Sequence, residues 1–68
     1  MELRNLRTLA AIAEFGSFSA AAEELGYTQS TVTMQIKALE EELGVPLFDR
    51  IGRRVSLTDG GRQAVQSA

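Results

Sequence analysis

The arrangement of this chain is decided by residues 20–44, which read AAAEELGYTQSTVTMQIKALEEELG. Residues 20–25 form a short helical pattern that ends at Gly26, because glycine can take the left-handed conformation that closes helices. Thr28 is a natural N-cap and opens a longer helix over residues 29–43. The apolar residues of that helix recur at spacings of four, three and four and form one stripe: Val32, Ile36, Leu39 and Leu43. The stretch therefore predicts two helices joined by a tight turn.

The residues before position 20 predict a first helix and the cap of the second. Apolar residues recur at three- and four-residue spacing from Leu3 to Ala13, which is typical of a helix with one buried face. Gly16 is expected to end that helix. Ser17 and Ser19 each carry the hydroxyl that caps a following helix, so both are candidates for the N-cap of residues 20–25.

The pattern changes from helical to extended after Pro46, which stops the longer helix. Residues 47–50 and 54–57 are short candidate strands. Gly52 lies between them and suits the tight turn of a hairpin, which often needs a positive φ angle. A two-stranded hairpin is therefore expected to follow the three helices.

A last helix is expected to begin after Thr58, whose hydroxyl suits an N-cap. Gly60 and Gly61 lie in its first turn, and an interior glycine costs about 1 kcal/mol relative to alanine. We therefore expect this helix to start raggedly. With it, the predicted fold class is mainly α, with one small hairpin.

The composition fits one small domain and argues against several functions. The chain has 68 residues, of which 44% are hydrophobic and 24% charged, and it has neither cysteine nor histidine. Disulfides are therefore impossible, a zinc site is improbable, and few groups remain for catalysis, so we predict no enzyme, metal or cofactor. No apolar run approaches the roughly 20 residues of a membrane span, and no signal peptide opens the chain. A cytoplasmic protein without membrane contact is expected.

A short helix, a tight turn and a longer helix form the helix-turn-helix arrangement, although a simple three-helix bundle needs the same apolar residues. The polar side of the longer helix favours the first interpretation. Residues 29–39 contain no carboxylate, and one face of the helix carries Ser30, Thr33, Met34 and Lys37, flanked by Gln29, Thr31 and Gln35. Such a surface suits a helix that enters the major groove of DNA, where a carboxylate would face phosphates.

The charge distribution partly offsets a net charge of −2, which is unusual for a nucleic-acid-binding domain. Residues 45–68 hold four arginines and two aspartates, a local charge of +2. Three of these arginines, Arg50, Arg53 and Arg54, surround the hairpin turn, where they can contact the DNA backbone or minor groove. The acidic residues 40–42 would point away from the duplex. The alternative is a domain for protein–protein contact with this glutamate patch as its interface.

The sequence resembles the N-terminal domain of LysR-type transcriptional regulators over essentially its whole length. The resemblance lies in residues 21–25, 28–40 and 42–50, with matches also at 16–18 and 57–58. Its most specific parts are the run Gln-Ile-x-x-Leu-Glu at 35–40 and the run Leu-Gly-Val-x-Leu-Phe-x-Arg at 43–50. It implies a winged helix-turn-helix over residues 1–57, with 29–42 as recognition helix and 47–57 as wing.

The resemblance also implies site residues. Matched residue by residue, the DNA-contacting positions of the family fall on Thr28, Gln29, Ser30, Thr33, Met34 and Lys37, and on Arg53 in the wing, with Arg54 beside it. Four positions depart from the commonest pattern of the family. Ser30 stands where proline is frequent, Thr33 where serine is usual, Met34 where a basic residue is common, and Gly60 where alanine is common.

Full-length members of the family continue into a long dimerising linker helix and a ligand-sensing domain. The resemblance therefore implies that residues 58–68 are the start of the linker and that the chain is an excised DNA-binding domain. Double-stranded DNA is the expected partner. A homo-oligomer is expected for the full-length parent, with weak or no association here, and a small-molecule effector would act only through a domain absent from this sequence.

Overall fold

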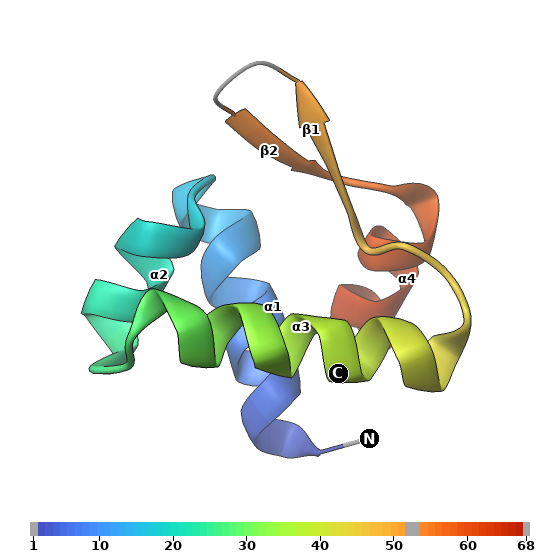
Figure 1. Ribbon diagram of the computed structural model, residues 1–68. Coiled ribbons are helices and arrows are strands. Elements are labelled where there is room, and N and C mark those ends of the chain that lie inside the picture. The colour runs from blue at the N-terminus through green and yellow to red at the C-terminus, as the bar shows by residue number, and fades with distance from the viewer. Residues whose placement is uncertain (1, 52–53, 68) are drawn as a thin grey trace.

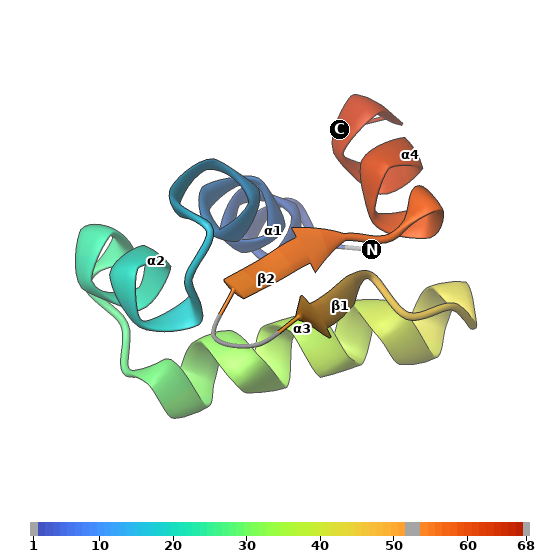
Figure 2. The ribbon, with the colours of Figure 1, turned by 90° about the horizontal axis from the view of Figure 1, so that it is seen from above.

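The computed structural model describes residues 2–51 and 54–67, with only the backbone described at Arg50, Ile51, Arg54 and Ser67. These residues form helices and a two-stranded sheet in the order α1 (Leu3–Phe15), α2 (Phe18–Leu25), α3 (Gln29–Leu43), β1 (Phe48–Ile51), β2 (Arg54–Leu57) and α4 (Asp59–Ser67) (Figure 1). Seen from above, α3 lies along one side of the molecule with α1 behind it, and α2 and α4 lie at opposite ends (Figure 2). The mainly helical fold with one hairpin is confirmed.

The second helix begins two residues earlier than the sequence predicted. Phe18 is its first residue, and the Ser17 hydroxyl accepts a hydrogen bond from the backbone N–H of Ala20 at 3.2 Å. Ser17 is therefore the N-cap, and Ser19, the other candidate, lies inside the first turn. Gly26 ends the helix with φ of 77°, a left-handed conformation that a side chain would make costly. The turn between α2 and α3 depends on that glycine.

The core lies between α1, α2 and α3 and is closed by one residue from the loop after α3. Small side chains from α2, Ala21 and Ala22, are buried and let this helix approach its neighbours closely. The other buried apolar residues are Leu9, Ala11, Ile12, Val32, Ile36, Leu39 and Leu47. Thr8 is also fully buried, and its hydroxyl donates to the side-chain oxygen of Gln35 on α3. That buried hydrogen bond links α1 to α3 at a defined rotation of the two helices.

The hairpin pairs β1 and β2 in antiparallel register, with Phe48 opposite Leu57 and Ile51 opposite Arg54. The first strand begins at Phe48, one residue later than predicted. Leu47 lies before it with a fully buried side chain, its N–H donating to Oε2 of Glu40 at 2.8 Å. Its carbonyl oxygen accepts a hydrogen bond from the N–H of Thr58 at 3.0 Å. Leu47 therefore joins the end of α3 to the base of the hairpin.

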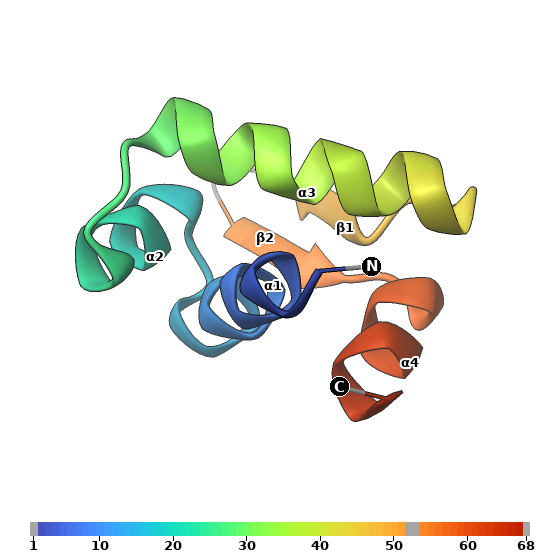
Figure 3. The same cartoon turned by 90° about the horizontal axis from the view of Figure 1, so that it is seen from below.

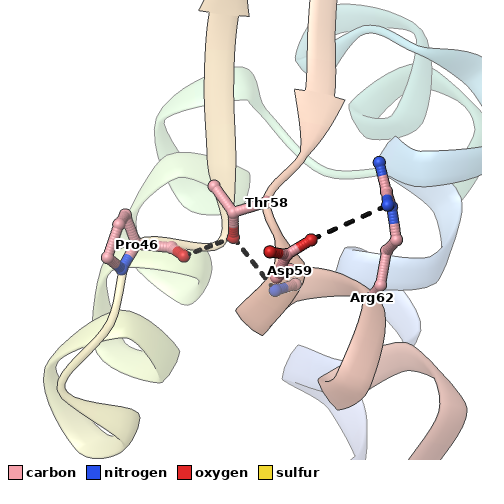
Figure 4. Close-up of polar contacts among 5 residues, drawn as sticks. Pro46, Thr58, Asp59 and Arg62 are labelled. Atoms are coloured by element: carbon pink, nitrogen blue, oxygen red, sulfur yellow. Dashed lines mark hydrogen bonds and ion pairs between the residues drawn. The ribbon is translucent and has the colours of Figure 1, made fainter.

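The start of α4 is regular, so the expectation of a ragged start is wrong. The Thr58 hydroxyl accepts from the N–H of Gly61 at 3.0 Å and donates to the carbonyl oxygen of Pro46 at 2.6 Å (Figure 4). The first helical bond follows, from the N–H of Arg62 to the carbonyl oxygen of Thr58 at 3.0 Å. The exposed pair of Arg62 and Asp59, 3.7 Å apart, contributes little to stability. Capping by Thr58 thus compensates for the helix propensity that the glycines lack.

The two glycines of α4 have different surroundings. A Cβ atom at Gly61 would overlap the backbone carbonyl oxygen of Leu47 and lie 2.8 Å from Cδ2 of Leu57. A Cβ atom at Gly60 would lie 2.9 Å from Cγ2 of the exposed Val45, so that a side chain rather than backbone would have to shift. Only Gly61 is therefore required for the close approach of α4 to the loop after α3.

We predict that Gly61→Ala lowers the free energy of unfolding by about 1–3 kcal/mol, because the methyl group meets backbone that has no room to move. Gly60→Ala is the matched control. It should be neutral or stabilising by up to about 1 kcal/mol, since alanine has the higher helix propensity. Urea denaturation followed by circular dichroism measures both. An equal loss for the two variants would contradict the close approach at Gly61.

Candidate nucleic-acid interface

The face of α3 opposite the core is exposed over its first three turns. Val32, Ile36 and Leu39 point into the core and are buried. On the other side, the side chains of Gln29, Ser30, Met34, Lys37 and Ala38 are exposed, and that of Thr33 is half-buried. Seen from below, α3 lies along the outer edge of the molecule with no other element in front of it (Figure 3). The structure therefore brings the predicted residues of α3 together on one open surface. We call the solvent-facing side of residues 28–38 the reading face.

Three hydroxyls of the reading face, those of Thr28, Thr31 and Thr33, already form hydrogen bonds within the first turns of the helix. Oγ1 of Thr28 accepts from the N–H of Thr31 at 3.2 Å and lies 2.9 Å from its hydroxyl, which makes Thr28 the N-cap. The Thr33 hydroxyl donates to the carbonyl oxygen of Gln29 at 3.0 Å. Each of these threonines therefore has a structural role, and only its remaining hydrogen-bonding capacity is available to a ligand.

The other polar side chains of the reading face are available. Gln29, Ser30 and Lys37 have no side-chain hydrogen bond or ion pair with any residue in the ranges 2–51 and 54–67. An amide, a hydroxyl and an ammonium group offer donors, and the amide and hydroxyl also offer acceptors. The backbone N–H groups of the first turn add partial positive charge at the same end of α3. The surface suits a ligand that carries both negative charge and hydrogen-bonding edges.

The acidic residues at the far end of α3 do not form one uniform patch. Glu41 and Glu42 are exposed, but Glu40 is half-buried and its carboxylate accepts the hydrogen bond from Leu47. Sequence reasoning missed this role. The available signal was Leu47 itself. This apolar residue follows Pro46, and once it is buried its backbone N–H needs an acceptor from a nearby residue. The glutamate patch considered as a protein-binding surface is therefore smaller than the sequence suggested.

The base of the hairpin lies next to the reading face. The rings of Phe18 and Phe48 meet edge to face with centroids 5.5 Å apart, which connects α2 to β1. A pocket of about 180 Å³ is lined by both of these rings and, from α3, by Thr33, Ile36, Lys37 and Glu40. The wing and the reading face thus adjoin one another.

The basic residues of the wing are only partly within the described structure. Arg53 lies outside the described residues, and so does Gly52. Arg54 begins β2, where its backbone pairs with Ile51. The contacts of these arginines with a ligand therefore remain predictions from the sequence.

Neither a metal-ligand cluster nor a membrane-spanning helix is found among the described residues. Within 2–51 and 54–67, the acidic side chains do not gather into a group of three that could hold a metal ion. No helix formed by the described residues is long and apolar enough to cross a membrane. The reading face is the candidate site that the geometry supports.

Known proteins similar to this chain were found by sequence and by structure. The model of the family described as "Bacterial regulatory helix-turn-helix protein, lysR family" matches residues 3–62. The HTH-type transcriptional activator CmpR of Synechocystis sp. is 52% identical over 66 residues, which cover 97% of this chain and 21% of CmpR. The RuBisCO operon transcriptional regulator of Allochromatium vinosum is 46% identical over 63 residues, 93% of this chain and again 21% of the relative. The chain thus spans about a fifth of the length of these relatives.

A solved structure with the same fold contains DNA. The DNA-binding domain of CbnR, crystallised as a complex with DNA, superposes with a TM-score of 0.92 at 40% identity and covers 98% of this chain and 77% of that one. The match extends over the helices and the hairpin together. The similarity therefore includes the relative placement of α3 and the wing.

We predict that Thr28→Ala lowers the free energy of unfolding by about 1 kcal/mol, because α3 loses its N-cap. Thr28→Ser keeps a capping hydroxyl and should change stability by a few tenths of that amount. Ser30→Ala is the control. Ser30 lies two residues after Thr28 and its side chain has no hydrogen bond to the described residues, so this substitution should leave stability unchanged. Thermal and urea denaturation of the three variants test this. Equal stability of Thr28→Ala and the unsubstituted chain would show that the cap is not significant.

Proposed function

The chain belongs to the lysR family of bacterial regulatory helix-turn-helix proteins, and from this membership we propose that it binds double-stranded DNA sequence-specifically, as the DNA-binding domain of a transcriptional regulator. The observation that carries the proposal is the exposed, carboxylate-free reading face on the first three turns of α3. A helix with such a face fits the major groove, because its polar side chains meet base edges and it brings no carboxylate against the negatively charged phosphates. The solved complex of a similar domain with DNA supports the same interpretation.

The residues of the reading face take different roles in this proposal. Gln29 and Ser30, whose polar groups are available, contact base edges, and Lys37 contacts phosphates. Thr28 and Thr33 use the hydrogen-bonding capacity that remains after their contacts within the helix. All of these residues lie on α3, which packs against the core, so their side chains keep a defined spacing and orientation.

The wing supplies contacts that do not depend on the base sequence. Arg53 and Arg54 carry positive charge at the hairpin, and we assign them to the DNA backbone or the minor groove. Such contacts release counterions and supply most of the sequence-independent affinity. An overall charge of −2 is compatible with this because the acidic residues 40–42 lie in the last turn of α3, after the reading face.

A module for protein–protein contact through the glutamate patch is not favoured. Glu40 is engaged with the backbone of Leu47, so the patch does not present three equivalent carboxylates, and a cluster of acidic residues by itself indicates no partner. The similar domain crystallised with DNA also argues for nucleic acid as the ligand.

The proposal extends to the whole regulator. Because the relatives are about five times longer than this chain, we assign residues 1–57 to the DNA-binding domain and residues 58–68 to the start of a linker helix. The regulator is a cytoplasmic homo-oligomer with an effector domain of its own. Ala64 and Val65, the apolar residues of α4 that could serve an interface, already pack against the core of the same chain, so this chain alone associates weakly.

We predict that the 68-residue chain binds random-sequence duplex DNA with an affinity that falls steeply with salt. Lys37→Ala should flatten the slope of log affinity against log salt by about 1, because one phosphate contact is lost. Arg62→Ala is the matched control. It removes the same charge from α4, outside the reading face, and should leave the slope unchanged. Fluorescence anisotropy at several salt concentrations gives the slopes. Salt-independent binding, or none, would contradict DNA as the ligand.

We further predict that Gln29→Ala and Ser30→Ala each cost about 1–3 kcal/mol on the preferred sequence and much less on random duplex DNA. The preferred sequence is obtained by selection from a random duplex library with the unsubstituted chain. Gln63→Ala, the same kind of substitution at an exposed position of α4 outside the reading face, is the matched control. Equal losses on selected and random DNA would show that Gln29 and Ser30 contact only the backbone.

A further inference from the structure

Met34 is the most exposed of the large apolar side chains in the described part of the chain, with 70% of its surface accessible to solvent. It lies in the middle of the reading face, one turn after Ser30 and one turn before Lys37 and Ala38. Single exposed apolar residues are common on protein surfaces and need no explanation by themselves. The surroundings of Met34 distinguish it from such residues.

The reading face leaves Met34 as its one long apolar group. Its neighbours one turn away are short hydroxyls, an alanine and a lysine, and the first carboxylate after it along α3 is that of Glu40, which accepts a hydrogen bond from Leu47. The Thr33 hydroxyl next to it is bonded to the carbonyl oxygen of Gln29. A flexible, unbranched thioether is therefore exposed to solvent among short side chains and one lysine.

The apolar feature that the major groove offers to such a side chain is the 5-methyl group of thymine. A thioether has no hydrogen to donate and is a weak acceptor, so it cannot replace the bidentate pairs that arginine, lysine or asparagine form with purines. We propose that Met34 is a specificity-determining residue that selects thymine at one position of each site by packing on its 5-methyl group. The inference rests on the proposed function, because it requires α3 to lie in the major groove.

The size of the effect follows from the burial of one methyl group. Removing the methyl group from the thymine in contact should weaken binding by about three- to four-fold. The hydrogen-bonding edges of uracil are those of thymine, so contacts from Gln29 and Ser30 stay the same. Met34→Ala should weaken binding to the thymine-containing duplex, and it should then make no distinction between thymine and uracil at that position.

The test uses the 68-residue chain and the duplex enriched from a random library by the unsubstituted chain. Each thymine of that duplex is replaced in turn by deoxyuridine, and affinities are measured by fluorescence anisotropy. We expect one thymine per site at which uracil weakens binding by about three- to four-fold, with this difference lost in Met34→Ala. Met34→Leu keeps an apolar side chain and should keep the preference for thymine.

Leu3→Ala is the matched control, because Leu3 is 63% exposed but lies at the start of α1, outside the reading face. It should discriminate thymine from uracil as the unsubstituted chain does. A chain insensitive to every uracil, or a Met34→Ala variant that keeps the same preference, would overturn the inference while DNA binding stands. Failure to enrich or bind any duplex in a salt-dependent manner would overturn the proposed function together with it.

Discussion

The arrangement of the domain depends on the contacts that Leu47 makes. Its side chain closes the core, its N–H donates to Glu40 of α3, and its carbonyl oxygen accepts from Thr58. The same carbonyl lies against Gly61, where no side chain fits. One residue thus joins the recognition helix, the hairpin and α4. Losing one of these hydrogen bonds would leave a polar group without a partner, which costs free energy when the group is partly buried. This cost holds the three elements in one geometry.

The reading face benefits from that rigidity. Its helix is held from behind by Val32, Ile36 and Leu39 and by the hydrogen bond between Thr8 and Gln35, and it is capped by Thr28. A site on a packed helix positions its side chains more precisely than a site on a loop does. The residues of α3 therefore fall into two groups. The buried residues fix the position of the helix, and the exposed residues contribute little to the core and can contact the ligand.

Sequence reasoning predicted the parts of this fold that local chemistry controls. The glycines after α1, α2 and α3 ended these helices where expected, and the bounds of α3 were correct because Thr28 and Gly44 mark them. Errors arose where two residues competed for a role, as Ser17 and Ser19 did for the cap of α2. They also arose where propensity opposed tertiary contact. Helix propensity predicted a frayed start of α4, yet the carbonyl oxygen of Leu47 requires glycine there, and Thr58 caps the turn.

The sequence by itself determined the helix-turn-helix, the hairpin and the carboxylate-free face of α3, because periodicity, caps and charge are local properties of the chain. Tertiary structure alone decided which polar groups of that face are available. It showed that the Thr33 hydroxyl is bonded to the carbonyl oxygen of Gln29 and that the carboxylate of Glu40 accepts the N–H of Leu47 at the base of the hairpin. It also decided why Gly61 is required. These contacts join residues that are distant in sequence or depend on a particular rotamer, and no local pattern contains that information.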